Sequence, residues 1–376
     1  MTYLNNIYKL ETILLLLFFS LNVMATSEKD DDIKLAITID SAIYHGNGDI
    51  VDKYIDYDTF TQRVFQKLHK QPSEWKEYAS AFKQNIRLGD LLIEQIGSEG
   101  EYSFVKVIEN PDGQTNLLYR MLKGDGWLDY HEVLLVKNHS GEWNVADVYF
   151  YFSGTYFSDI IATLLAQEDQ ELVANQSLRK SLLLTRELFG YNQEGMYGNT
   201  ITAYDSLSNY FKKQKNTRLA LLMALAGQGD MTQLENLKAK YLSDFPYDKS
   251  IRLMMMEVYG SLDNYEQSKV MNDELSELIG GDDYLKLRTA EIYLSWDKSS
   301  KAKKLLKKMI KAESFPTDAR LLLMDVYYVE ENYKGLYTEL MTVSDMVGVS
   351  PEEILPKEHY PNFYASNSWQ NRKKQQ

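Results

Sequence analysis

The chain has 376 residues, of which 44% are hydrophobic and 25% charged, and its formal net charge at pH 7 is −13. This length suits two domains, or one domain followed by an array of repeats. The negative charge argues against a general nucleic-acid binder, because such proteins neutralise phosphates with basic patches. The sequence contains no cysteine, which excludes disulfides, thiolate catalysis and cysteine-ligated metals.

The N-terminus carries one apolar run. Residues 13–25 are mostly apolar, follow Lys9 and end in small residues at Val23 and Ala25. The run has the length of the apolar part of a signal peptide and is shorter than the roughly 20 residues that span a bilayer. We therefore predict a cleaved signal peptide over residues 1–25, with an uncleaved anchor as the alternative. Because secreted eukaryotic domains of this size usually carry disulfides, we predict a secreted protein of the bacterial periplasm, without a membrane span in the mature chain.

The first half of the chain changes from a helical to a strand pattern. Residues 26–165 hold 23 acidic and 13 basic residues, so most of the net charge lies here. Apolar spacing predicts helices first, over residues 33–49, 54–69 and 72–97. Alternating residues then predict four strands, over residues 101–109, 114–123, 127–137 and 142–152. The strands are separated by "NPDG", "GDG" and "NHSG", in which glycine suits a positive φ. Helices followed by an antiparallel meander indicate an α+β domain over residues 26–165.

The last predicted strand and its continuation read "GEWNVADVYFYFSGTYFSDII". Helices followed by a curved sheet with this ending resemble the cone-shaped nuclear-transport-factor-two-like superfamily. Within this superfamily the stretch resembles the periplasmic toluene-tolerance and phospholipid-carrier proteins, and the residues that carry the resemblance are Trp143, Val145, Asp147, Val148 and Gly154. The resemblance implies a curved four-stranded sheet that encloses a pocket in many relatives. Some of those relatives are enzymes, some bind apolar ligands and many only mediate contacts, so the fold does not choose among these functions.

The second half shows a repeat of 34 residues. Tyr259, Tyr293 and Tyr327 are separated by this period within helical patterns over residues 166–350. Two helices in each period resemble the tetratricopeptide repeat, and Ala290, Tyr293 and Ala302 stand at three positions of its motif. Basic residues occupy the position where that motif has tryptophan, namely Arg218, Arg252, Lys286 and Arg320. We expect their stems to cover apolar surface while the charges stay in water. The sequence therefore predicts an all-α solenoid of helical hairpins after the α+β domain.

The turns between paired helices recur with the same period. They read "GD" at 229–230, "DN" at 263–264, "DK" at 297–298 and "EN" at 331–332. Asp230 and Asp263 each precede a Gln or Glu by three residues, so both are expected to cap the second helix of a hairpin. After the repeats, residues 351–376 carry three prolines, four aromatic residues and a basic end. We expect this segment to cap the last hairpin and to end in a solvated tail.

In such a solenoid the first helix of each hairpin lines a concave surface. Positions i, i+4 and i+7 of these helices place leucines and a ladder of carboxylates on that surface. The predicted groove residues are Leu253, Glu257, Leu287, Glu291, Leu294, Leu321, Asp325 and Tyr328. They would bind an extended segment with apolar and basic side chains. The alternative is a solvated helix face without a binding role.

The first half offers one candidate acid–base group. Strand alternation puts Asp129 and His131 on one face, which Arg120 and Asp147 on the neighbouring strands could share. An imidazole between carboxylates can transfer protons. The alternative is an ordinary polar sheet face. No metal-ligand spacing, nucleophile elbow or phosphate-binding loop occurs, so we expect no cofactor and no metal.

These patterns favour a non-catalytic periplasmic adaptor that binds a protein or peptide partner of apolar and basic character through its helical repeats. One alternative is a carrier that holds an apolar ligand such as a lipid in the N-terminal cone. Another is a hydrolase or isomerase that uses Asp129, His131 and Asp147. An apolar pocket in the cone would favour the carrier, a filled cone the adaptor, and convergence of the three polar residues the enzyme.

Overall fold

The computed structural model describes residues 31–98, 100–110, 112–124, 126–168 and 175–371. The predicted signal peptide and most of the basic tail lie outside these residues. The chain forms two compact units, divided between Tyr241 and Leu242. The boundary predicted at residue 165 thus lies inside the first of these units. We refer to them as unit 1 and unit 2 and describe each by itself.

Unit 1 begins with helices, as predicted, but one of them is divided. Residues 31–44 are helical, and four further helices precede the sheet, α2 (Gly48–Lys53), α3 (Tyr57–Lys67), α4 (Pro72–Asn85) and α5 (Leu88–Ile96). The single helix predicted over residues 72–97 is therefore wrong. The break allows α5 to meet α2 at Gly48 and Gly89, where a Cβ on either glycine would lie 2.2 Å from the other segment. Only a residue without a side chain permits this contact.

The sheet of unit 1 is an antiparallel meander of five strands in the order β1-β2-β3-β4-β5. The strands are β1 (Glu101–Glu109), β2 (Thr115–Leu122), β3 (Leu128–Lys137), β4 (Trp143–Phe150) and β5 (Thr155–Tyr156). The four predicted strands are present, and the two-residue β5 corrects the predicted number. The three connecting turns place Gly113, Gly126 and Gly141 at φ values of 84–85°. Glycine was expected at these positions because other residues rarely adopt this conformation.

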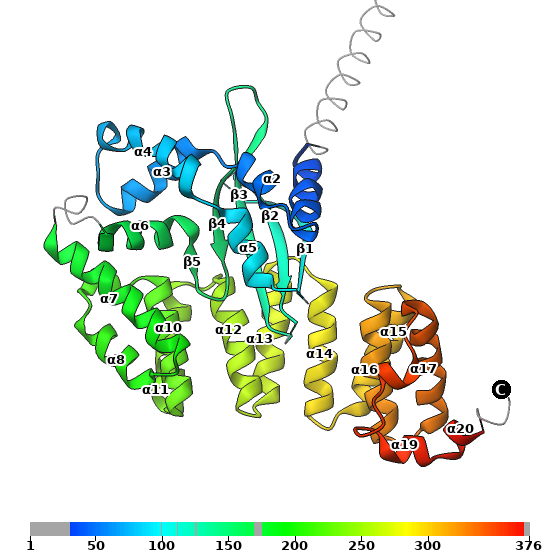
Figure 1. The fold of residues 1–376 in the computed structure, drawn as a ribbon. Coiled ribbons are helices and arrows are strands. Elements are labelled where there is room, and N and C mark those ends of the chain that lie inside the picture. The colour runs from blue at the N-terminus through cyan, green and yellow to red at the C-terminus, as the bar shows by residue number, and fades with distance from the viewer. Residues whose placement is uncertain (1–30, 99, 111, 125, 169–174, 372–376) are drawn as a thin grey trace, which may run out of the picture. The chain divides into compact units, whose positions relative to one another are not determined.

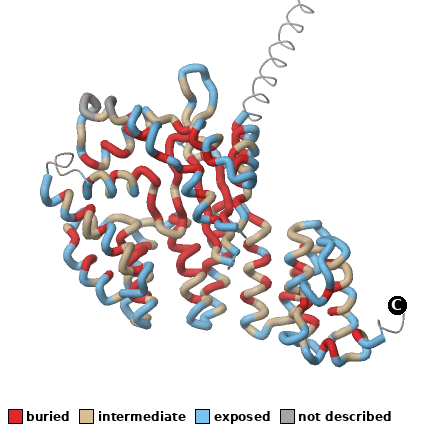
Figure 2. Tube along the Cα trace, in the orientation of Figure 1, coloured by how far each residue is buried: buried red, intermediate tan, exposed pale blue. Residues whose placement is uncertain are grey.

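One face of the sheet packs against the helices and forms the core of unit 1. This core includes Leu117 and Tyr119 of β2, Val133 and Leu135 of β3, and Val148 of β4. Figure 2 shows the strands of the sheet as largely buried. Leu117 pairs with Val133, and Val133 pairs with Val148, on neighbouring strands, so these three side chains lie on one face of the sheet.

The core of unit 1 continues into the helices after the sheet. These are α6 (Phe157–Glu168), α7 (Gln176–Gln193), α8 (Tyr197–Ser206), α9 (Asn209–Lys212), α10 (Lys215–Gln228) and α11 (Met231–Asp244), the last of which contains the division between the units. Leu178 and Leu182 of α7 belong to the same apolar core as the sheet. A Cβ on Gly154, which follows β4, would lie 2.3 Å from Leu219 of α10. These contacts explain why the first hairpins belong to unit 1.

Unit 2 consists of helical hairpins that stand side by side (Figure 1). Its helices are α12 (Lys249–Ser261), α13 (Tyr265–Leu278), α14 (Asp283–Ser295), α15 (Ser299–Lys311), α16 (Pro316–Val329) and α17 (Tyr333–Val347). Of the tyrosines at the 34-residue period, Tyr259 and Tyr327 are buried and Tyr293 is half-buried, and Ala290 is fully buried. The predicted helical hairpins are therefore present.

The turns inside the hairpins share one backbone conformation. Gly229, Asp263, Asp297 and Glu331 follow each other at 34-residue intervals and have φ values of 73°, 56°, 52° and 54°. The next residue caps the second helix in three of the four turns. Asp230 accepts a hydrogen bond from the backbone N–H of Gln233 at 3.0 Å, as predicted. The prediction for Asp263 is wrong, because Asp263 is the turn residue and Asn264 caps α13 instead.

The basic residues at the tryptophan position of the motif differ in exposure: Arg218 and Arg252 are buried, Arg320 is half-buried and Lys286 is exposed. Arg252 is 8% exposed and donates to the carbonyl groups of Asp248 and Pro246 at 2.8 and 2.7 Å. It also pairs with Glu274 at 3.1 Å. Arg320 of α16 pairs with Glu339 of α17. The expectation that these charges stay in water is therefore wrong for Arg252, whose guanidinium joins neighbouring segments instead.

The segment after the repeats covers the last hairpin, as predicted. It contains three short helices, α18 (Pro351–Ile354), α19 (Pro361–Ala365) and α20 (Asn367–Gln370). Phe363 and Trp369 are buried in the apolar core that α14 to α17 form. Their side chains give the last hairpin the cover that a further repeat would otherwise supply.

Candidate functional site

The residues predicted to line a groove divide into a buried and an accessible group. Leu253 of α12 and Leu287 of α14 are 0% and 2% exposed, so both are core residues and neither offers surface to a ligand. The other six residues are half-buried or exposed, namely Glu257, Glu291, Leu294, Leu321, Asp325 and Tyr328. We call these six residues of the first helices the A-helix face. The leucines were misplaced because the helical period alone does not fix how far neighbouring helices cover a side chain.

Two carboxylates of the A-helix face share one arginine. Arg288 donates to Glu257 of α12 at 2.6 Å and to Glu291 of its own helix at 2.7 Å. Burial raises the pKa of Glu291, while Arg288 acts in the opposite direction. Arg288 was not among the predicted groove residues, although it lies one turn before Glu291 and on the same side of the helix. The pair of carboxylates is thus partly neutralised before any partner arrives.

The third carboxylate contacts the C-terminal segment. The hydroxyl group of Tyr360 donates to Asp325 at 2.9 Å, and the ring of Tyr360 meets Tyr328 edge-on with 4.9 Å between the centroids. Burial raises the pKa of Asp325, which the hydrogen bond from Tyr360 opposes. Burial and the neighbouring carboxylate raise the pKa of Tyr360 to about 12, so its hydroxyl group stays protonated at neutral pH and can donate the hydrogen bond to Asp325. This part of the A-helix face therefore already holds a segment that crosses it.

The remaining apolar positions are accessible. Leu321 is 36% exposed and Leu294 is half-buried. An accessible leucine beside a paired carboxylate can contact both apolar and hydrogen-bonding groups of an extended segment.

The candidate acid–base residues of unit 1 form two separate clusters. His131 is fully buried, and its Nε2 lies 3.5 Å from Asp129 Oδ2. Asp147 instead accepts from Arg63 Nε at 2.6 Å and from the hydroxyl group of Ser158 at 2.5 Å. In the sheet His131 of β3 pairs with Phe150 of β4, whereas Asp147 of β4 pairs with Leu134 of β3. Asp147 therefore lies three residues along β4 from the position opposite His131. The three residues expected to converge in an enzyme therefore do not meet in one cleft.

The face of the sheet around His131 differs from the expected one. Arg120 pairs with Tyr130 across β2 and β3, so it lies on the opposite face from His131, and Tyr119 takes the expected place. Neither ring nitrogen of His131 nor the hydroxyl group of Tyr102 has a hydrogen-bond partner among the described residues. The two rings are 5.4 Å apart. Burial raises the pKa of Tyr102 well above its ordinary value.

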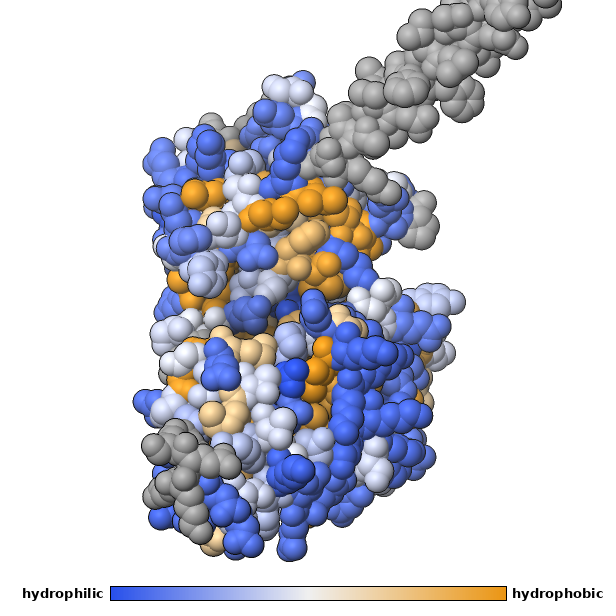
Figure 3. Space-filling view, turned by 90° about the vertical axis from the view of Figure 1, so that its right-hand side faces the viewer, coloured by the Kyte–Doolittle hydropathy of each residue, from blue (hydrophilic) through white to orange (hydrophobic). Residues whose placement is uncertain are grey.

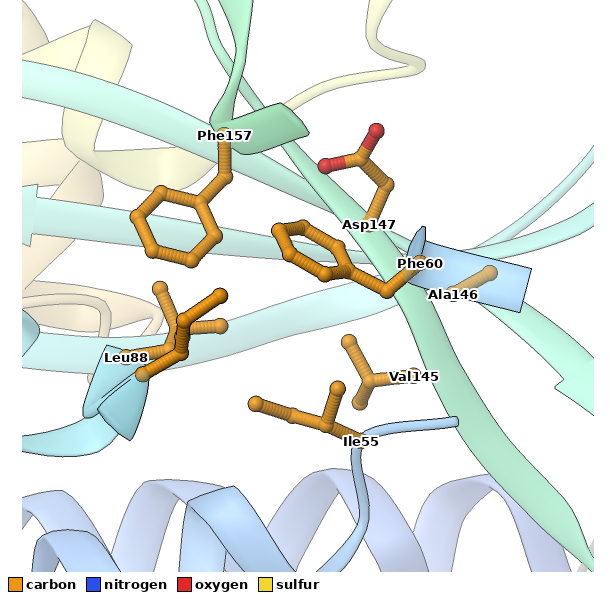
Figure 4. A pocket seen from close by; sticks show the side chains of 8 residues that line it. Ile55, Phe60, Leu88, Val145, Ala146, Asp147 and Phe157 are labelled. Atoms are coloured by element: carbon orange, nitrogen blue, oxygen red, sulfur yellow. The ribbon is translucent and has the colours of Figure 1, made fainter. Parts of the chain in front are cut away.

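The pocket between sheet and helices is apolar and filled. It is lined by Ile55, Phe60, Ile86, Leu88, Val145, Ala146, Asp147 and Phe157 (Figure 4). The space left between these side chains accommodates no water-sized molecule, with an accessible volume of about 0 Å³. A carrier would need room for its ligand here, and this conformation has none.

The surface of unit 1 also carries exposed apolar residues. Figure 3 shows apolar side chains on the surface close to the beginning of the described residues. In this part of the chain Ile33 and Ile37, one helical turn apart, are 39% and 57% exposed. Within the described ranges no group of acidic or histidine residues could hold a metal ion. No helix among those residues is long and apolar enough to cross a membrane.

Comparisons with known proteins give little further information. No protein-family model matches the chain, and no curated protein matches it. Two solved structures of MamA, "MamA MSR-1 C2" and a mutant, align with 46% of this chain and with 95% and 99% of their own. Their sequence identities are 11% and 12%, and both TM-scores are 0.34. At that TM-score the likeness supports no statement about function.

Proposed function

We propose that the chain is a non-catalytic adaptor, in which a tetratricopeptide-like solenoid follows an α+β domain in the sequence, and that it binds a protein partner along the A-helix face. The observation that carries the proposal is the contact of Tyr360 with Asp325 and Tyr328. Within this chain the contact shows the kind of interaction that we propose for a partner. The hydroxyl group of Tyr360 binds a carboxylate of a first helix, and its ring packs against an aromatic residue of the same helix. A partner segment of the same chemistry would extend this contact toward Leu321 and Leu294.

The structure changes the partner chemistry that the sequence suggested. Glu257 and Glu291 already share Arg288, so they offer less attraction to a basic partner than three free carboxylates would. Hydrogen-bond donors and aromatic or aliphatic side chains suit this face better. Binding would then depend on buried apolar area, at about 25 cal/mol per Å², more than on charge.

Export remains part of this proposal. Its support is the apolar run over residues 13–25 and the absence of cysteine in a chain of this length. Fractionation of the producing cell, with N-terminal sequencing of the recovered protein, tests the location. Recovery with the cytoplasmic proteins and an intact Met1 would contradict it.

A photo-crosslinking amino acid placed at Leu321 or Leu294 in the full-length protein tests the surface. Matched positions on second helices are Val270 of α13 and Met346 of α17, which are 38% and 48% exposed. In the producing cell we expect the A-helix positions to crosslink one and the same protein and the two control positions not to do so. Crosslinks of equal yield from all four positions, or none from Leu321 and Leu294, would rule out this face as the binding surface.

A further inference from the structure

Helix α15 of unit 2 carries a strong concentration of positive charge. Its thirteen residues, Ser299–Lys311, contain six lysines and no acidic residue, in a chain of net charge −13. The opposite side of the helix is apolar, with Ala302, Leu306 and Met309 buried in the core. The helix is thus held in place by one side and presents lysines on the other.

Five of these lysines are exposed and form what we call the lysine face, namely Lys301, Lys304, Lys307, Lys308 and Lys311. The sixth, Lys303, is half-buried and pairs with Glu330 at 2.5 Å. In the part of the chain that the structure describes, no carboxylate pairs with a lysine of the lysine face. This differs from the A-helix face, where the charges are already engaged within the protein.

The lysine face follows the helical period. Positions 301, 304, 308 and 311 recur every three or four residues, so they lie in one row. At a rise of 1.5 Å per residue the row is about 15 Å long. Like charges three and four positions apart repel each other and destabilise a helix. The repulsion along the row therefore lowers the stability of α15, and the cation–π contact of Lys301 with the ring of Tyr293, at 5.5 Å, offsets part of it.

We propose that the lysine face binds an acidic polypeptide segment of a partner protein. The row is one helix wide, and the second helix of the preceding hairpin, α13, exposes Asp273 and Glu277. A narrow row suits a single chain with several carboxylates over about 15 Å, because alternate side chains of an extended segment recur about every 7 Å. A broad anionic surface such as a membrane would be repelled by the negative charge of the remaining protein.

The composition of the row argues in the same direction. It contains no aromatic residue on which nucleic-acid bases could stack, so single-stranded nucleic acid has no specific contact to make. It contains lysine and no arginine, and lysine acts as a mobile point charge without a fixed bidentate geometry. Binding should therefore tolerate varied acidic sequences and fall steeply with salt.

The inference rests on the proposed role in protein binding, but it concerns a different surface. The A-helix face belongs to first helices, whereas α15 is a second helix. Loss of the lysine row should leave the crosslink from Leu321 unchanged. If the crosslink from Leu321 is absent but the acidic peptide still binds, the proposal of partner binding along the A-helix face fails and the proposal for the lysine face stands. The two proposals can therefore fail separately.

The test uses the full-length protein and a fluorescein-labelled peptide of alternating glutamate and serine, followed by fluorescence anisotropy at 50 and 300 mM salt. The variant changes Lys301, Lys304, Lys308 and Lys311 to glutamine. The matched control changes four exposed lysines elsewhere to glutamine, namely Lys213, Lys240, Lys334 and Lys357. Lysine and glutamine have similar helix propensity, and circular dichroism checks that both variants remain folded.

We expect the row variant to bind the peptide about tenfold or more weakly at 50 mM salt and the control variant to lose less than about threefold, since exposed pairs each contribute little but add along a row. At 300 mM salt the natural protein should approach the row variant. Equal losses in the two variants would overturn the proposal, because only net charge would then matter. Binding of phosphatidylglycerol vesicles or of single-stranded DNA through the row, in place of the peptide, would also overturn it.

Discussion

Replacing Arg63 with methionine removes the cation that faces the buried carboxylate of Asp147 and retains most of the apolar stem. Arg63 Nε lies 2.6 Å from Asp147 Oδ2, and the two side chains are 30% and 0% exposed. Removing one partner of a buried ion pair costs about 3–5 kcal/mol, because the other charge is left without compensation. Asp147 keeps its hydrogen bond from Ser158, so we expect the lower end, about 3 kcal/mol, at pH 8.

The loss should depend on pH in a defined direction. Burial raises the pKa of Asp147 above the ordinary value of 3.8, against the opposing effect of Arg63. The pKa of Asp147 is thus ordinary in the unfolded chain and higher in the folded protein. At pH values between the two, the folded protein binds the proton more readily, so the free energy of unfolding falls as the pH rises through this range. Without Arg63 the pKa of Asp147 rises further and the range extends upward. The Arg63→Met variant should therefore lose less stability at pH 5 than at pH 8.

Calorimetric unfolding of the full-length protein at both pH values measures the effect. For a unit of this size 3 kcal/mol corresponds to a fall in Tm of about 6–12 °C. The matched control is Lys34→Met, because Lys34 and Asp31 lie 2.9 Å apart and their side chains are 72% and 64% exposed. Exposed pairs contribute about 1 kcal/mol or less, so the control should shift Tm by a few degrees at most. A fall of equal size at both pH values would refute the reasoning about Asp147.

Two further predictions concern one half-buried and one buried polar group. Arg288→Met leaves Glu257 and Glu291 without their shared cation, so the free energy of unfolding measured with urea should fall by about 2 kcal/mol at pH 8 and by less at pH 5; equal stability at pH 8 would contradict the bridging role. His131→Phe replaces a buried imidazole that has no hydrogen-bond partner among the described residues by an apolar ring, so stability in urea should stay unchanged or rise. A loss above about 2 kcal/mol would mean that His131 makes a contact that this conformation lacks.

Local signals in the sequence predicted the elements well. The turn glycines fixed the three hairpins of the sheet, because few other residues adopt φ near +84°. The 34-residue period predicted the helical hairpins, since the volume and spacing of inward residues matter more than their identity. The pattern could not show that α4 and α5 are separate helices. That break depends on the contact of Gly48 with Gly89, which lies outside the range of local periodicity.

Contacts between distant segments account for the other differences. Arg288 was not predicted because its ion pair with Glu257, 31 residues away, depends on the distance between α12 and α14. The contact of Tyr360 with Asp325 depends on the path of the C-terminal segment. The predicted boundary at residue 165 followed a change from strand to helix pattern. The core of unit 1 extends beyond it through Leu178, and no local pattern marks which core a helix joins.

The repeated turn conformation has a consequence for the mechanics of unit 2. Asp263, Asp297 and Glu331 hold a left-handed backbone that glycine holds at the equivalent position 229. For a residue with a side chain the left-handed conformation costs roughly 1 kcal/mol relative to glycine, and for aspartate it costs somewhat less. Each hairpin of unit 2 therefore retains strain at the point where its two helices reverse direction. Opening of a single hairpin releases that strain, so amide hydrogen exchange at these turns should be fast. The hairpins of unit 2 can then open one at a time instead of all together.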